Sequence, residues 1–185
     1  LGKYEVTQEE YEEIIDNNPS EFKGARLPVE MVSWNDAVAF CEALTKKERP
    51  SQGWKFTLPS NAQWEYACRS GTTTNYSWGD DITPKLANYE DSALERTVEV
   101  GSYAPNPWGF FDMHGNVQEW CADWRDDYPS VSVTDPFGPE TGSVRFLRGG
   151  HWNFGGALLR SAFHRGDRPI FRGKTVGFRV SFQKQ

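Results

Sequence analysis

The strongest constraint on the fold of this chain is the point at which its helical pattern stops. Clear helix signals lie in the first 70 residues, and from Gly71 onward no apolar period of a helix can be followed. The rest of the chain consists of short segments separated by Gly, Pro, Asn and Asp, which favour turns. This division predicts an α+β fold with a few early helices and short antiparallel strands late in the chain.

Three helices are predicted by capping boxes. In a capping box, the side chain of a Ser or Thr accepts the backbone N–H of the residue three positions later, and the side chain of that residue accepts the backbone N–H of the Ser or Thr. These boxes begin at Thr7, Ser33 and Ser60. The second and third boxes are followed by apolar faces at Ala37, Phe40, Cys41 and Leu44, and at Trp64, Ala67 and Cys68. Short strands are predicted at 98–103, 144–148 and 176–182.

The composition narrows the class of protein. A chain of 185 residues suits one domain, and its 17 Gly, 11 Pro and 8 Trp indicate a loop-rich fold with aromatic rings in the core. A net charge of −6 argues against binding to nucleic acid or to an anionic membrane. No apolar run reaches the length of about 20 residues that a membrane span needs. Cys41, Cys68 and Cys121 are too widely spaced for a metal pair, and we expect them to be small buried residues.

Six segments resemble, in order, motifs of the formylglycine-generating-enzyme (sulfatase-modifying-factor) superfamily. They are residues 32–37, LPSNAQWEYACR at 58–69, YSWG at 76–79, GNVQEW at 115–120, LRGG at 147–150 and GFRV at 177–180. The resemblance implies one C-type-lectin-like domain over residues 1–185, without the strand that usually opens the family's fold. It also implies that Trp64, Trp78, Trp120 and Trp124 belong to the scaffold.

The resemblance also indicates a missing activity. Enzymes of this family oxidise a substrate cysteine with copper held by two cysteines shortly after the late Gly-Gly, and thiolates suit Cu(I). Residues 149–160 contain no cysteine here. The three histidines lack metal-ligand spacing, and neither a phosphate loop nor a nucleophile elbow is present. We therefore expect no catalytic residues and no required cofactor.

One metal site is implied by the resemblance. Family members bind Ca²⁺ near an "ANY" segment and through the Asn and Glu of the "GNxxEW" motif, and oxygen ligands from irregular backbone suit this ion. Asn88, Asn116 and Glu119 match these positions. The alternative is that these side chains only cap backbone groups.

The segment from residue 148 to residue 179 keeps the family framework but fills the positions between with mixed residues. We expect Trp152, Arg160, Ser161 and Arg179 to support this segment from beneath. The candidate ligand-binding residues are Phe154, Gly155, Gly156, Leu158, Phe163, His164, Arg165, Asp167, Arg168, Ile170, Phe171, Gly173 and Thr175. An ordinary buried core is the alternative for Leu158 and Phe163.

This pattern resembles the variable region of proteins diversified by diversity-generating retroelements, which rewrite adenines, usually in asparagine codons. Such rewriting does not reach Glu, Gln, Lys, Met or Trp. These five types make up 39 of the 185 residues, so about five would be expected in residues 153–176, where only Lys174 occurs.

The leading hypothesis is a non-catalytic protein that binds a protein or glycan on another cell or a host, displayed on a cell surface or virion. Loop-borne side chains on a rigid scaffold are suited to binding. Two alternatives stay open: an accessory domain of a larger enzyme, such as a kinase or sulfoxide synthase, and a structural module of a secreted complex. The oligomeric state is not predicted.

Overall fold

The three predicted helices are present in the computed structural model, which describes residues 1–127, 131 and 133–184. They are α1 (Gln8–Ile15), α2 (Trp34–Glu48) and α3 (Asn61–Arg69). Thr7, Ser33 and Ser60 form the expected capping boxes, because each accepts a backbone N–H while the partner side chain bonds back. None of the helices in these residues is long and apolar enough to cross a membrane.

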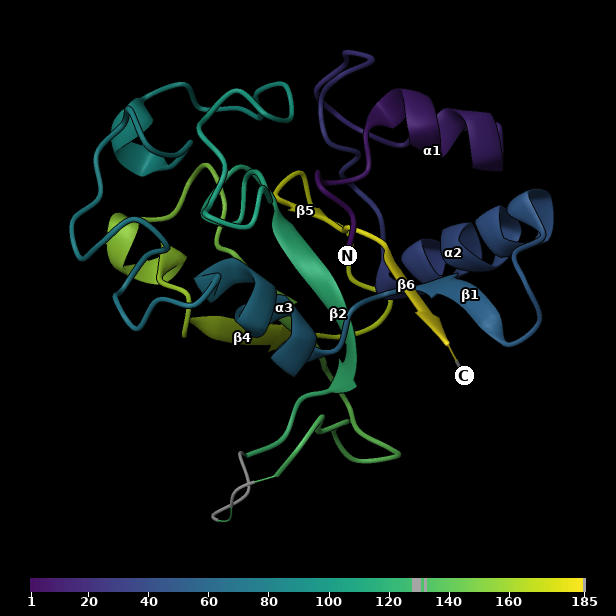
Figure 1. The fold of residues 1–185 in the computed structure, drawn as a ribbon. Coiled ribbons are helices and arrows are strands. Elements are labelled where there is room, and N and C mark those ends of the chain that lie inside the picture. Colours follow the sequence, from purple (N-terminus) through teal and green to yellow (C-terminus); the bar gives the residue numbers. More distant parts are fainter. Residues whose placement is uncertain (128–130, 132, 185) are drawn as a thin grey trace.

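The strands form two sheets (Figure 1). The larger sheet has the order β4-β3-β2-β5, from β2 (Gln118–Trp124), β3 (Arg145–Arg148), β4 (His164–Asp167) and β5 (Val176–Gly177). The smaller sheet pairs β1 (Trp54–Thr57) with β6 (Ser181–Lys184). Two 3₁₀ helices, η1 (Glu90–Ser92) and η2 (Gly156–Leu159), lie in the loops.

The strand predictions were only partly right. The strand expected at 144–148 is confirmed as β3, whereas the one expected at 176–182 is divided into β5 and β6. Residues 98–103 form turns instead of a strand, because Gly101 has a φ of +77° and its N–H donates to the Asp112 carboxylate. Strands β1, β2 and β4 were not predicted, and β5 pairs with β2 in parallel.

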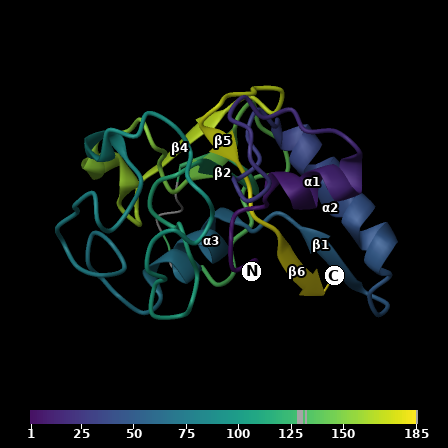
Figure 2. The same ribbon diagram turned by 90° about the horizontal axis from the view of Figure 1, so that it is seen from above.

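The larger sheet divides the core into two layers (Figure 2). Trp120 and Leu147 face α1 and α2, whereas the next residue of β2, Cys121, packs with Trp64 on the α3 side. This follows from the alternation of side chains along a strand. Trp64 and Trp120 are fully buried, and all three cysteines are buried and free, as the sequence predicts.

Candidate ligand-binding site

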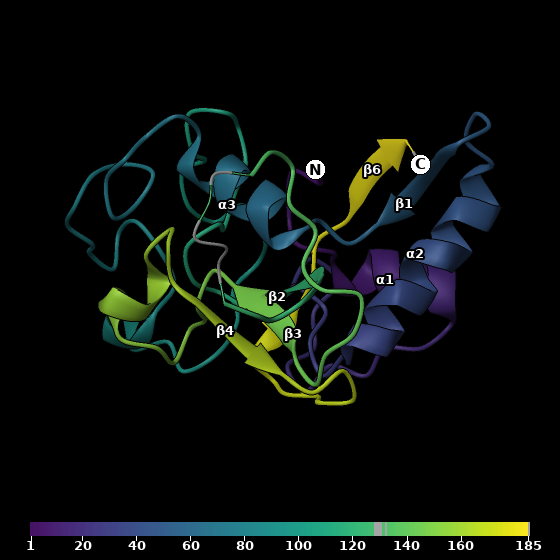
Figure 3. The same cartoon turned by 90° about the horizontal axis from the view of Figure 1, so that it is seen from below.

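The thirteen candidate residues lie between β3 and β5, in the stretch of chain that includes the edge strand β4 (Figure 3). They lie around η2, on the edge strand β4 and in the connection 168–175. None of them is buried. Arg168 and Ile170 are exposed, the latter to 71%, and the other eleven are partly buried. Each of the thirteen residues is therefore at least partly accessible to solvent.

Arg148 fastens the start of β4 to α3. Its side chain is 0% exposed, and it donates to the Asn61 amide oxygen at 2.6 Å and to the Glu65 carboxylate at 2.7 Å. The same guanidinium donates to the carbonyls of Ser161 and Phe163 at 3.1 and 3.2 Å. A buried guanidinium with this many acceptors holds the backbone beneath the candidate residues in one geometry.

Strand β4 presents its residues on two opposite faces. His164 pairs with Arg148 and lies beside the Phe146 ring, with 5.1 Å between ring centroids, on the α3 side. Arg165 and Asp167 lie on the other face, where their side chains form an ion pair of 2.8 Å. Burial, reinforced by the charge of Arg148, lowers the pKa of His164. The edge strand therefore separates His164 from the two charged residues.

The connection 168–175 mixes exposed and anchored residues. The Arg168 carbonyl accepts the Phe171 N–H at 2.9 Å, which closes a turn with Ile170 at its exposed tip. The Phe171 ring packs against the main core, and Arg172 forms an ion pair of 2.8 Å with Asp36 at the start of α2. Phe171 therefore holds this connection against the core, and it is also a candidate contact for the ligand.

A second group of candidates surrounds η2. The Phe154 ring lies 3.7 Å from the His151 ring and 6.2 Å from the Phe163 ring, between centroids. Burial lowers the pKa of His151 to about 4, so this ring is neutral near pH 7. Phe154 also packs against the small core cluster that contains Leu159, so its ring is not a free surface group.

Two positions differ from their predicted roles. A Cβ at Gly156 would lie 2.6 Å from the Ile82 Cγ2 atom, and the Gly156 carbonyl accepts the Tyr76 hydroxyl at 2.8 Å, so packing requires glycine there. Arg160, expected beneath the segment, is exposed. Trp152, Ser161 and Arg179 are buried as expected.

The sequence did not predict that Arg125 contacts β4. A Cβ added at Gly166 would lie 2.7 Å from the Arg125 Cδ atom. The exposed side chain of Arg125 therefore lies against the middle of β4. No sequence signal marks this contact, because it joins β4 to a residue that follows β2 by one position.

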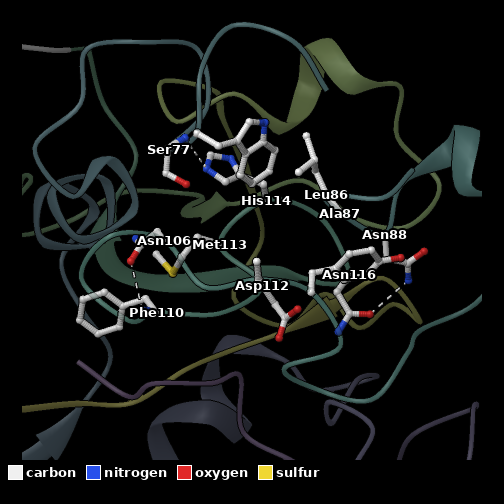
Figure 4. Close-up of a pocket in the computed structure, with 13 residues that line it drawn as sticks. Ser77, Leu86, Ala87, Asn88, Asn106, Phe110, Asp112, Met113, His114 and Asn116 are labelled. Atoms are coloured by element: carbon white, nitrogen blue, oxygen red, sulfur yellow. Dashed lines mark hydrogen bonds between the residues drawn. The ribbon is translucent and has the colours of Figure 1, made fainter. Parts of the chain in front are cut away.

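The amide groups proposed as calcium ligands lie together in a small cavity (Figure 4). Asn88 donates to the Arg96 carbonyl at 2.9 Å and to the Asn116 amide oxygen at 3.3 Å. Asn116 donates to the Glu5 carboxylate at 2.7 Å and accepts the Val98 N–H at 3.0 Å. The Asn88 amide oxygen is buried and has no hydrogen-bond partner in the described part of the chain.

Glu119, the third proposed calcium ligand, is bonded to Arg179 and Trp64 instead of to Asn88 or Asn116. Its two carboxylate oxygens each accept a bond of 2.6 Å from Arg179, and one also accepts the Trp64 indole N–H at 2.7 Å. Burial raises the pKa of nearby Asp112 to about 6 and that of Glu5 well above its usual value. Asn88 thus offers a free oxygen to a cation, whereas the oxygens of Glu119 are already occupied by Arg179.

The described residues do not favour a metal site built from His, Cys, Asp and Glu side chains. Within the described residues, no three or more His, Cys, Asp and Glu side chains are grouped to hold a metal. Burial raises the pKa of the Cys41 and Cys68 thiols to about 12, and that of Cys121 well above its usual value. These thiols stay protonated near pH 7, which disfavours them as metal ligands.

This architecture, with short sheets and long ordered loops around an edge surface, defines a C-type-lectin-like domain. The family model described as "Sulfatase-modifying factor enzyme 1-like domain" matches residues 1–184, and the chain belongs to this family. The resemblance inferred from the motifs is therefore confirmed.

Individual relatives have different activities. The formylglycine-generating enzyme of Streptomyces coelicolor is 39% identical over 174 residues, which cover 83% of this chain and 52% of the enzyme. The serine/threonine-protein kinase pkn1 of Chlamydia pneumoniae is 36% identical over 85% of this chain and 24% of the kinase. The chain thus spans about half the length of the first relative and a quarter of the second.

Among solved structures, Treponema denticola variable protein 1 is similar over nearly the whole chain. The TM-score is 0.89 at 29% sequence identity, covering 98% of this chain and 82% of that protein. The fold is thus shared by proteins with enzymatic names and by a variable protein, so residues rather than fold must decide the function.

Proposed function

We propose that this chain is a non-catalytic ligand-binding protein whose binding surface, formed by η2, β4 and residues 168–175, is diversified by a diversity-generating retroelement. The observation that carries the proposal is the arrangement of this segment. None of its mixed residues is buried, while the matching framework residues Trp152, Ser161 and Arg179 are buried. The ligand is a protein or glycan on another cell or a host surface.

The DNA beside the gene provides the direct test. We expect a reverse-transcriptase gene and a near-identical copy of the sequence that encodes residues 148–179, differing from it at adenines in the copy. Sequencing the flanking region of the source genome measures both. A neighbourhood with neither feature would contradict the diversification part of the proposal.

The non-catalytic part of the proposal rests on thiol chemistry. Copper oxidation in relatives needs a pair of thiolates, whereas the three cysteines of this chain are buried and hold their protons. None of them lies in residues 149–160.

The kinase relative favours one second candidate. In that protein the matching region is a quarter of the chain, so a domain of this family can be part of a larger protein. If this chain is an accessory domain, its full-length gene should encode a catalytic domain next to residues 1–185, which sequencing would also reveal.

We also propose that calcium binds at Asn88, with Glu119 serving Arg179 instead of the ion. The support is the buried, unpartnered amide oxygen of Asn88, since hard oxygen ligands suit this ion. Removing the metal with excess chelator, and verifying that it is gone, should lower the melting temperature, because an ion bound to the native state stabilises it. Differential scanning calorimetry measures the shift.

Two variants sharpen the calcium test. Asn88→Ala should melt at the same temperature with and without chelator, whereas Asn153→Ala, an exposed control, should keep the chelator effect. An unchanged melting curve for the original chain in excess chelator would leave Asn88 with only its hydrogen bonds to Arg96 and Asn116.

A further inference from the structure

The charge of the binding segment is opposite to that of the rest of the molecule. Residues 154–175 contain five Lys and Arg but only one Asp, a net charge of +4. The chain has 20 Lys and Arg against 26 Asp and Glu, so its other residues carry 15 cations and 25 anions, a net charge of −10. An acidic partner would therefore be attracted by this segment and repelled by the net charge of the rest of the chain, which orients its approach.

Several of these cations are available to a partner. The exposed Arg168 guanidinium makes no hydrogen bond or ion pair with the described residues. Arg160 is also exposed and uses one nitrogen for the Ala157 carbonyl, at 2.8 Å. Arg165, with a side chain 37% exposed, forms an ion pair with Asp167. Each guanidinium keeps donors free for an incoming acceptor.

The two cations at the C-terminal end of the segment are already paired with carboxylates of other parts of the chain. Arg172 forms its ion pair with Asp36, and Lys174 lies 3.7 Å from the Glu21 carboxylate. The available positive charge is thus concentrated along β4 and its two ends, and not spread evenly over the segment.

Apolar groups accompany these arginines. Ile170, the most exposed apolar candidate, is two positions from Arg168. The Phe163 N–H donates to the Arg160 carbonyl at 2.8 Å, and the Phe163 ring lies 6.2 Å from the Phe154 ring. Arginine forks match carboxylates in paired hydrogen bonds, and aromatic residues with arginine dominate the energetics of protein interfaces. A highly sulfated glycan offers anions but little apolar surface for Ile170.

We infer that the ligand of this surface is an acidic face of a protein, held by Arg160, Arg165 and Arg168 around an apolar contact at Ile170. This inference rests on the ligand-binding function proposed above, whose diversification part is tested separately by the DNA beside the gene. Lowering the salt concentration should strengthen such binding, because screening of exposed charges weakens it.

The experiment uses a glutamate–tyrosine copolymer as an acidic polypeptide probe and heparin as a sulfated-glycan probe, with biolayer interferometry as the readout. We expect the copolymer to bind the chain at about 50 mM NaCl more tightly than at about 300 mM. The double variant Arg165→Ser/Arg168→Ser should bind it at least about tenfold more weakly. The matched control Lys46→Ser/Lys85→Ser removes the same charge from exposed positions elsewhere and should bind like the original chain.

Three results would overturn the inference: no binding of the copolymer, equal losses in both double variants, or tighter binding of heparin that Arg165→Ser/Arg168→Ser abolishes. The last result would assign a sulfated glycan as the ligand. Melting temperatures of all variants show that each is folded. If the inference fails while the flanking DNA carries the reverse transcriptase and template copy, the diversified binder stands with a ligand of another chemistry.

Discussion

Replacing Trp120 with alanine should lower the free energy of unfolding by about 3–5 kcal/mol, the loss typical of a large aromatic residue removed from a core. Trp120 is 0% exposed and packs between the larger sheet and α2. Its indole N–H donates to the Val32 carbonyl at 3.0 Å, so the substitution leaves both a cavity and a buried acceptor without its donor. Urea unfolding followed by circular dichroism measures the change.

Trp78→Ala is the matched control, because both tryptophans lie in family motifs. Trp78 is 36% exposed and stacks on the Tyr76 ring at the surface, and its N–H donates to a nearby loop carbonyl. Its loss should cost about 1 kcal/mol. Equal losses at the two positions would contradict the assignment of Trp120 to the structural centre of the fold.

The helices could be predicted because their signals are local. Thr7, Ser33 and Ser60 each carry their bonding partner three residues away, so the sequence alone contains both halves of the capping box. The apolar face of α2 follows the same local rule, with Ala37 and Phe40 buried.

Strand β2 could not be predicted, because its burial depends on distant residues. It lies inside the sheet, so buried residues occur on both of its faces and the alternation that indicates a strand is lost. Glu119 is fully buried within it, where it is stabilised by the guanidinium of Arg179, 60 residues later in the chain. Such a pair cannot be predicted from the sequence, because only folding brings the two residues together.

The sequence predicted which segment forms the candidate surface, but it could not predict how the residues of this segment divide between surface and core. The positions that we propose to be rewritten share no physical preference, so the sequence could not distinguish exposed Ile170 from Phe171, whose ring packs on the core. Gly156 looked variable, whereas the Ile82 side chain leaves no room for a Cβ there. The opposite faces of His164 and Arg165 follow from the register of β4, a strand without a clear sequence signal.

Changing Arg165, Arg168 and Ile170 together to serine should abolish ligand binding and leave the domain folded. None of the three side chains belongs to a core cluster, and surface substitutions usually change stability by no more than about 0.5 kcal/mol each. Phe171→Ser is the contrasting variant. It removes a ring that packs against the main core and should cost about 2 kcal/mol.

The two variants separate binding from folding within residues 165–171. Binding to cells that carry the ligand, measured by flow cytometry with labelled protein, should disappear in the triple variant at an unchanged melting temperature. If the triple variant unfolds instead, these side chains support the core and the diversified surface fails as an explanation. If it stays folded and still binds, the ligand contacts lie elsewhere, because a surface that tolerates rewriting must carry its binding energy in the rewritten side chains.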